Sequence, residues 1–160
     1  MRVTHTIYDI QTIILSFFEY LCDNVSPFTD WSVVREFPDD DTLVATETPI
    51  IYVEQPIYTG SYVTQGGPSV STWSLVIGCW ASSDLGGLGE IAVMNSQILM
   101  YLNDTALLHQ VEFDVELGGA TVTDQTFLSQ GISIESYLGS KPVSGDSDDY
   151  YSELTLNLNA

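Results

Sequence analysis

The chain has 160 residues, 44% of them apolar, and its 22 acidic residues against three basic ones give a formal net charge of −19. This apolar content supplies enough buried surface for a folded domain and argues against an acidic disordered segment. The scarcity of lysine and arginine excludes the phosphate-binding surface that nucleic-acid-binding proteins use, and it disfavours anionic membranes.

The excess of acid also bears on the environment of the protein. A folded domain with so few cations repels itself in dilute buffer. Multimolar salt shortens the Debye length to roughly 3 Å or less and screens that repulsion. The composition therefore predicts adaptation to very salty surroundings, and an acidic protein from an ordinary environment is the alternative.

The length predicts a single domain over residues 1–160, large enough for its own core. No apolar run approaches the roughly 20 residues of a membrane-spanning helix, and the amino-terminal residues lack the pattern of a signal peptide. Cys22 and Cys79 lack metal-ligand spacing, so two buried thiols are expected, and a disulfide between them stays open.

A helix is predicted from Thr6 to Asp23 because apolar residues recur there at three- and four-residue steps. The stripe is formed by Ile7, Ile10, Ile14, Phe17 and Leu21, widened by Ile13 and Phe18. Asn24 and Pro27 end this helix. A short strand is expected at 30–37, and a second strand region at 49–58, where Pro56 turns the end into an edge or loop.

A flexible loop or hairpin tip is predicted over residues 60–71, which include Gly66-Gly67-Pro68. The strongest strand follows from Thr72 to Ser82 and is apolar on both faces, typical of a central strand or of a face given to a partner. A second helix is predicted from Leu88 to Asn103. Its apolar face comprises Leu88, Ile91, Ala92, Asn95, Ile98, Leu99 and Leu102, extended by Met94 and Tyr101.

Three further strands are predicted at 111–117, 132–138 and 150–158, with a second flexible loop at 139–149. The order of helix, strands, helix, strands predicts an α+β fold, a mostly antiparallel sheet with two helices packed on one face.

No group of residues predicts catalysis, a cofactor or a metal centre. His5 and His109 lack a neighbouring nucleophile, and the Gly86-Gly87-Leu88-Gly89 turn lacks the lysine of a phosphate loop. The acidic runs 39–41 and 146–149 are interpreted as hydrated loops, and whether they bind cations stays open. The sequence therefore predicts a protein that is not an enzyme, with no cofactor.

Aromatic residues are the candidate functional residues. Nine tyrosines and three tryptophans exceed what a core of this size needs, and aromatic side chains are enriched at protein interfaces. The candidates for a subunit interface are Tyr58, Tyr62, Trp73, Trp80, Tyr150 and Tyr151.

The chain resembles the tail terminator, or tail completion, proteins of long-tailed viruses. The segments that carry the resemblance are the strand end Gly78-Cys79-Trp80-Ala81-Ser82-Ser83, the helix end Ile98 to Asp104, the helix from Ile7 to Leu21, the strand around Trp31, and Pro49-Ile50-Ile51-Tyr52-Val53. Together with the charge, the resemblance points to a virus of a halophilic archaeon.

The resemblance implies a structural virion protein of the tail–neck junction, assembled in the host cytoplasm. In that family, a homo-hexameric ring caps the tail tube protein and joins it to the neck or head–tail connector protein, and genome DNA passes through the lumen. No membrane is involved, and the DNA is not specifically bound. The alternatives are another neck ring protein (a stopper or head–tail adaptor), a tail tube subunit, or an enzyme of a halophile with unrecognised acidic catalytic residues.

Overall fold

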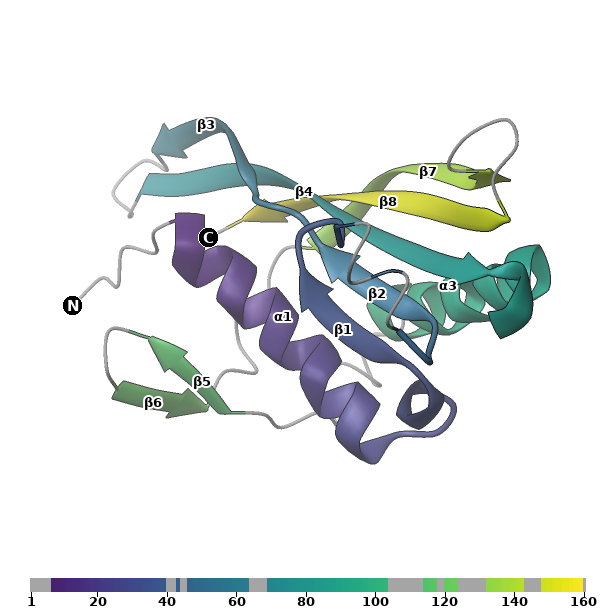
Figure 1. The fold of residues 1–160 in the computed structure, drawn as a ribbon. Helices are drawn as coiled ribbons and strands as arrows, with labels where there is room; N and C mark the ends of the chain where they lie inside the picture. Colours follow the sequence, from purple (N-terminus) through teal and green to yellow (C-terminus); the bar gives the residue numbers. More distant parts are fainter. Residues whose placement is uncertain are drawn as a thin grey trace.

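The computed structural model describes residues 7–39, 43, 46–63, 69–103, 114–117, 120–123, 132–142 and 148–159. The helices are α1 (Ile7–Asn24) and α3 (Gly87–Asn103), with 3-10 turns η1 (Phe28–Asp30) and η2 (Ser83–Leu85). The strands are β1 (Ser32–Arg35), β2 (Ile50–Val53), β3 (Ile57–Val63), β4 (Ser69–Ser82), β5 (Asp114–Leu117), β6 (Ala120–Thr123), β7 (Ile132–Pro142) and β8 (Asp149–Asn159). Figure 1 shows their arrangement.

The main sheet has the strand order β1-β2-β4-β8-β7, and β3 also pairs with β4. Because β8 pairs with β4 along residues 72–82, β2 and β3 share the other edge of β4. β1 and β2 are parallel, whereas the remaining pairs of described strands are antiparallel. The predicted α+β class with a mostly antiparallel sheet is confirmed.

Helix α1 forms where the sequence predicts it. Its apolar stripe is buried from Ile10 onward, because Ile10, Ile13, Ile14, Phe17, Phe18 and Leu21 are each at most 1% exposed; the burial of Ile7 lies outside the description. The helix ends at Asn24, whose side-chain Nδ2 donates to the carbonyl oxygen of Tyr20 (2.9 Å). The amphipathic pattern therefore determines both the span of α1 and the face that it turns to the sheet.

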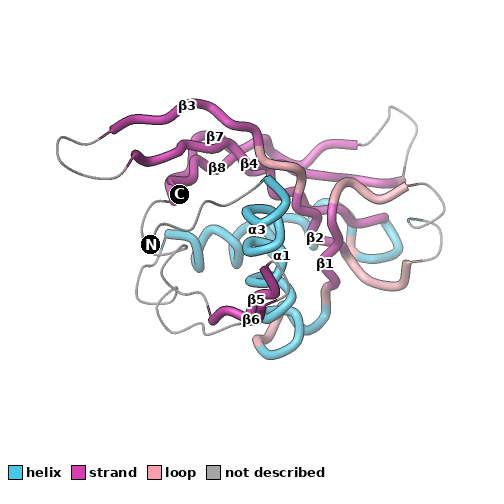
Figure 2. Tube along the Cα trace, turned by 90° about the vertical axis from the view of Figure 1, so that its left-hand side faces the viewer, coloured by secondary structure: helices cyan, strands magenta, loops and turns pink. Residues whose placement is uncertain are grey.

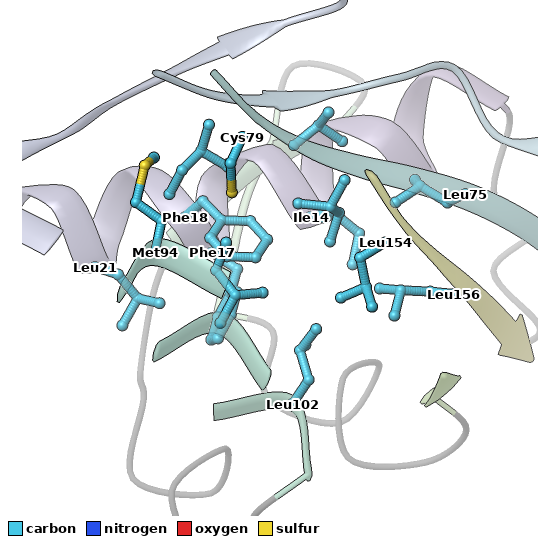
Figure 3. Packing of buried hydrophobic residues seen from close by; sticks show 14 of the residues in the cluster. Ile14, Phe17, Phe18, Leu21, Leu75, Cys79, Met94, Leu102, Leu154 and Leu156 are labelled. Carbon is cyan, nitrogen blue, oxygen red and sulfur yellow. The ribbon is translucent and has the colours of Figure 1, made fainter. Parts of the chain in front are cut away.

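The main core lies between the sheet and both helices (Figure 3). Strand β4 contributes alternate residues, Trp73, Leu75, Ile77, Cys79 and Ala81, and β8 contributes Leu154, Leu156 and Leu158. This period of two is that of a strand with one face buried. Residues of α1 and α3 belong to the same cluster, so both helices pack on one face of the sheet, as expected.

Strands β5 and β6 form a separate two-stranded sheet. Figure 2 shows it on the far side of the helices from the main sheet, which gives three layers. Val115 is buried in the main core, while its neighbours Asp114 and Glu116 are exposed, as the alternation of this segment predicts. Strand β6 is not among the strands that the sequence predicts; it has only four residues, Ala120–Thr123, and this run is too short to stand out in the sequence.

The predicted apolar face of α3 is wrong at its amino-terminal end. The buried residues are Gly87, Ile91, Met94, Asn95, Ile98 and Leu102. Leu88 is 47% exposed and Ala92 is exposed as well. The reason is Gly87, the buried residue of the first turn of α3. Gly87 lies against Tyr150, and a Cβ atom built on it would stand 3.6 Å from the tyrosine ring.

Both predicted loops are shorter than expected. Residues Gly60–Val63 and Ser69–Ser71 belong to the paired strands β3 and β4, so the interpretation as a hairpin holds and the loop is confined to 64–68, outside the described residues. Strand β7 extends to Pro142 and β8 begins at Asp149. Strand β7 therefore includes residues 139–142, which the sequence predicts as loop, and Lys141 and Pro142 pair with β8 after a register shift.

Neither helix of the described residues is long and apolar enough to cross a membrane.

Candidate subunit interface

The hairpin formed by β3 and β4 is free of charge in an acidic chain. No Asp, Glu, Lys or Arg stands between Glu54 and Asp84, a span that contains both strands in full. Two chains of the same large negative charge repel each other wherever carboxylates face one another. The hairpin is therefore a surface at which like-charged molecules are able to meet.

The start of β3 exposes large apolar side chains. Ile57 is 67% exposed and Tyr58 is 51% exposed, and the two point to opposite faces because they are neighbours in a strand. Among the described strands, β3 pairs only with β4, so no described strand lies along its other edge. An apolar edge strand of this kind is a site for pairing with another chain.

Tyr58 covers Trp73, the next candidate. The two rings meet edge to face with their centroids 5.3 Å apart, and Tyr58 pairs directly with Trp73 in the register of β3 and β4. Trp73 is 8% exposed and belongs to the main core, with no hydrogen-bond partner for its buried Nε1 among the described residues. Tyr58 is therefore the surface residue of this pair, and its ring packs on the buried ring of Trp73.

Trp80 is a core residue, not a surface residue, which corrects its place among the interface candidates. It is 1% exposed and forms a second small cluster with Ile50 and Tyr52 on the sheet face opposite the helices. Val34, Leu43 and Leu85 pack against this cluster. The sequence showed that β4 is apolar on both faces, but the chain itself covers the second face at Trp80.

Tyr150 and Tyr151 lie at the start of β8, and both are half-buried. Tyr150 packs against the main core, whereas Tyr151 pairs with Trp80 and lies edge to face with Phe37, at 6.5 Å between centroids. Tyr150 is registered with Ala81, eight residues along β4 from Trp73. At about 3.3 Å per residue, this separates Tyr150 from Tyr58 by roughly 26 Å along β4, and Tyr151, one residue nearer, by roughly 23 Å.

The structure thus brings Tyr58 and Trp73 together, and Trp80 and Tyr151 together, at opposite ends of β4. Tyr62 is paired with Val70 in the hairpin, but its side chain lies outside the described part of the chain. Ile57 was not among the candidates, although the uncharged run between Glu54 and Asp84 marks it in the sequence.

Carboxylates gather where β2 ends. Burial raises the pKa of Glu54, and the negative charges of Glu153 and Glu36 raise it further. Glu153 also accepts a hydrogen bond from the Tyr52 hydroxyl (3.4 Å), and Glu36 accepts one from Gln11 Nε2 (2.8 Å). Within the described ranges, no group of three or more His, Cys, Asp or Glu side chains is arranged to hold a metal ion.

Arg35, one of the three basic residues, is used inside the subunit. Its guanidinium donates to Gln11 Oε1 (2.6 Å) and to Thr12 Oγ1 (2.9 Å), and it lies 4.4 Å from the centroid of the Tyr8 ring. These contacts join β1 to the first turns of α1. They use two of the five N–H donors of the guanidinium, one on each terminal nitrogen.

No protein-family model matches the chain, and no curated protein matches it.

Proposed function

We propose that this protein is a structural virion protein that forms a ring at the end of a viral tail tube and joins the tube to the neck. The observation that carries the proposal is the uncharged β3–β4 hairpin with Ile57 and Tyr58 exposed, on a chain of net charge −19. The resemblance of the sequence to tail terminator proteins, and the α+β fold with two helices on one face, support it.

A ring of identical subunits closes through heterologous contacts, in which two different patches meet at each interface. The hairpin is well placed to be one of these patches because it projects from one end of the sheet (Figure 1). Apolar contact there is favourable, and the hairpin itself contributes no carboxylate to the interface, whereas burying an unpaired charge is costly. We propose a homo-hexamer that assembles best in multimolar salt.

The proposed ring lets genome DNA pass without holding it. DNA binding depends on Lys and Arg contacts to phosphates, and this chain has three such residues, of which Arg35 is engaged with α1. The remaining acidic surface repels phosphate. The proposed partners are therefore the tail tube protein and the neck connector protein, and the DNA passes through the ring without being bound.

The test has two parts, assembly and location. Mass photometry and light scattering in multimolar KCl should show a ring-sized oligomer, and electron microscopy should show its hole. The Ile57→Glu variant should shift the population to monomer, whereas Thr121→Glu, which adds the same charge at an exposed position on β6, should not.

Location is tested by labelling virions with an antibody against the protein. Label at the junction of tail and neck is expected. Label along the whole tail would identify a tube subunit instead. A protein that stays monomeric at every salt concentration and is absent from virions would overturn the proposal.

A further inference from the structure

Helix α3 presents a second uncharged surface to solvent. No charged residue stands between Glu90 and Asp104, and the Glu90 carboxylate accepts a hydrogen bond from Trp31 Nε1 (2.6 Å) inside the subunit. The exposed residues on this side of the helix are Leu88, Gly89, Ala92, Val93, Ser96, Met100 and Asn103. Of these, Leu88 and Val93 are 47% exposed and Met100 is 45% exposed.

Helix α1, in the same layer, is the natural comparison. It carries Asp9, Glu19 and Asp23, and the last two of these are exposed. Both helices bury one apolar face against the same core, so their burial does not explain the difference on their other faces. A solvent-facing helix surface that is apolar and uncharged on so acidic a chain has the composition of a contact surface.

We infer that the solvent face of α3 receives the β3–β4 hairpin of a second copy of this chain. Charge favours one occupant. A cationic partner would bind the acidic surfaces, whereas a partner as acidic as this one makes its closest contacts where both surfaces are neutral, because charges in direct contact repel even when salt screens longer distances. The second copy offers such a surface at Ile57 and Tyr58. The inference rests on the proposed ring, for which it supplies the second patch.

The positions of the two surfaces fit a head-to-tail contact. Figure 1 shows β3 at the upper left of the subunit and α3 at its right-hand side. Patches on opposite sides of a subunit leave both available at once, which allows each copy to contact two neighbours. Contact between α3 and α3 of a second copy would instead be isologous and would end at a dimer.

The test places a charge on each surface in turn. Val93→Glu should weaken assembly in high-salt light scattering by about tenfold or more in concentration, because it sets a carboxylate against an apolar partner surface. Tyr58→Lys should weaken it as well. The double variant Val93→Glu with Tyr58→Lys should recover at least part of the assembly, because the opposite charges then meet across the interface.

Thr121→Glu is the matched control, and circular dichroism should show that every variant is folded. Wild-type assembly by Val93→Glu, or no recovery in the double variant, would overturn the inference. Recovery on mixing separate Val93→Glu and Val93→Lys preparations would also overturn it, since that result identifies contact between two α3 helices.

Location in virions is an independent readout. Rings that respond to these variants but are missing from the tail–neck junction would leave the contact standing and defeat the proposed function. Label at the junction, combined with assembly that Val93→Glu leaves unchanged, would support the proposed function and overturn the inferred contact at α3.

Discussion

The ring of Tyr52 lies directly over Gly78, its partner in the register of β2 and β4. A Cβ atom built on Gly78 would stand 1.8 Å from Tyr52 Cζ, so no other residue fits without displacing the ring. Tyr52 is fully buried, with Phe37 edge to face at 5.1 Å and its hydroxyl donating to Glu153. The absence of a side chain at Gly78 therefore positions the second cluster of the sheet.

Gly78→Ala should destabilise the protein by about 1–3 kcal/mol, the usual cost of overpacking a core. Urea unfolding in high-salt buffer is the measurement. Gly89→Ala is the matched control, because no atom lies within 4 Å of its ideal Cβ position on α3. That change should be neutral or stabilise the helix by up to about 1 kcal/mol. Equal stability of Gly78→Ala and wild type would contradict the packing of Tyr52.

A buried polar chain joins α3 to the sheet and supplies a second prediction. Cys79 Sγ donates to Asn95 Oδ1 (3.5 Å), and Asn95 Nδ2 donates to Ser152 Oγ (2.7 Å). Asn95→Ala should cost about 1–3 kcal/mol of unfolding free energy, because it leaves buried polar groups without these partners. Ser96→Ala, one position along and exposed, should change stability by no more than about 0.5 kcal/mol. Similar urea midpoints for both variants would argue against these buried hydrogen bonds of Asn95.

The two cysteines are free and should be inert in the folded protein. Burial raises the pKa of Cys79 to about 12, with a hydrogen bond to Ser152 acting in the opposite direction. Burial also raises the pKa of Cys22 to about 12, reinforced by Asp23 and then Glu19. At pH 8 only roughly one such thiol in ten thousand is a reactive thiolate. Dithionitrobenzoate should therefore react slowly with native protein and fully in urea, and fast native reaction at both thiols would disprove this.

The elements with a clear period were predictable from sequence. The stripe of α1 and the alternation of β4 both follow from residue spacing alone, because each element turns one face to the same core. The face of α3 was harder to predict. Its buried stripe begins at Gly87, a residue without a side chain, so the apolar Leu88 beside it was assigned the buried place.

The candidate interface was predictable in part. Tyr58 is exposed as an interface residue must be, but Trp80 is buried because Val34, Leu43 and Leu85 of the same chain cover it. Periodicity shows that a strand has two apolar faces, and only the fold shows what covers each of them. Ile57 and the solvent face of α3 are better marked by missing charge than by aromatic content.

Glu54 should make stability depend on pH. Because its pKa is raised above the ordinary value of 4.5, the folded protein holds this proton more tightly than the unfolded chain. Its contribution to stability therefore falls as the pH rises from about 4.5 through the folded pKa. Glu54→Gln should exceed wild-type stability at pH 7, by less than about 1 kcal/mol since the group is partly solvated, and match it near pH 4.

Thermal melts of Glu54→Gln and wild type at fixed KCl, from pH 4 to pH 8, measure this difference. Glu116→Gln, an exposed carboxylate on β5, removes the same charge as a control. A Glu54→Gln variant that is less stable than wild type at pH 7 would show that Glu54 has a stabilising partner.

Stability should rise with salt, because screening relieves the repulsion among 22 acidic residues. The melting temperature should increase from dilute buffer into multimolar KCl. Glu19 and Asp23 offer a local test, since they lie four residues apart on α1. Burial is the main cause that raises the pKa of Glu19, and the negative charge of Asp23 raises it further. Like charges at this spacing destabilise a helix by about 0.2–0.5 kcal/mol.

Glu19→Gln with Asp23→Asn should therefore raise the melting temperature most in dilute buffer and least in multimolar KCl. The exchange variant Glu19→Asp with Asp23→Glu keeps both charges and should follow the wild-type salt curve. Screening also predicts that most of the change occurs at low ionic strength, where the Debye length shortens from about 30 Å at 0.01 M to about 10 Å at 0.1 M. A melting temperature that stays flat or falls as KCl increases would contradict adaptation to a salty environment, and the acidic composition would then need another explanation.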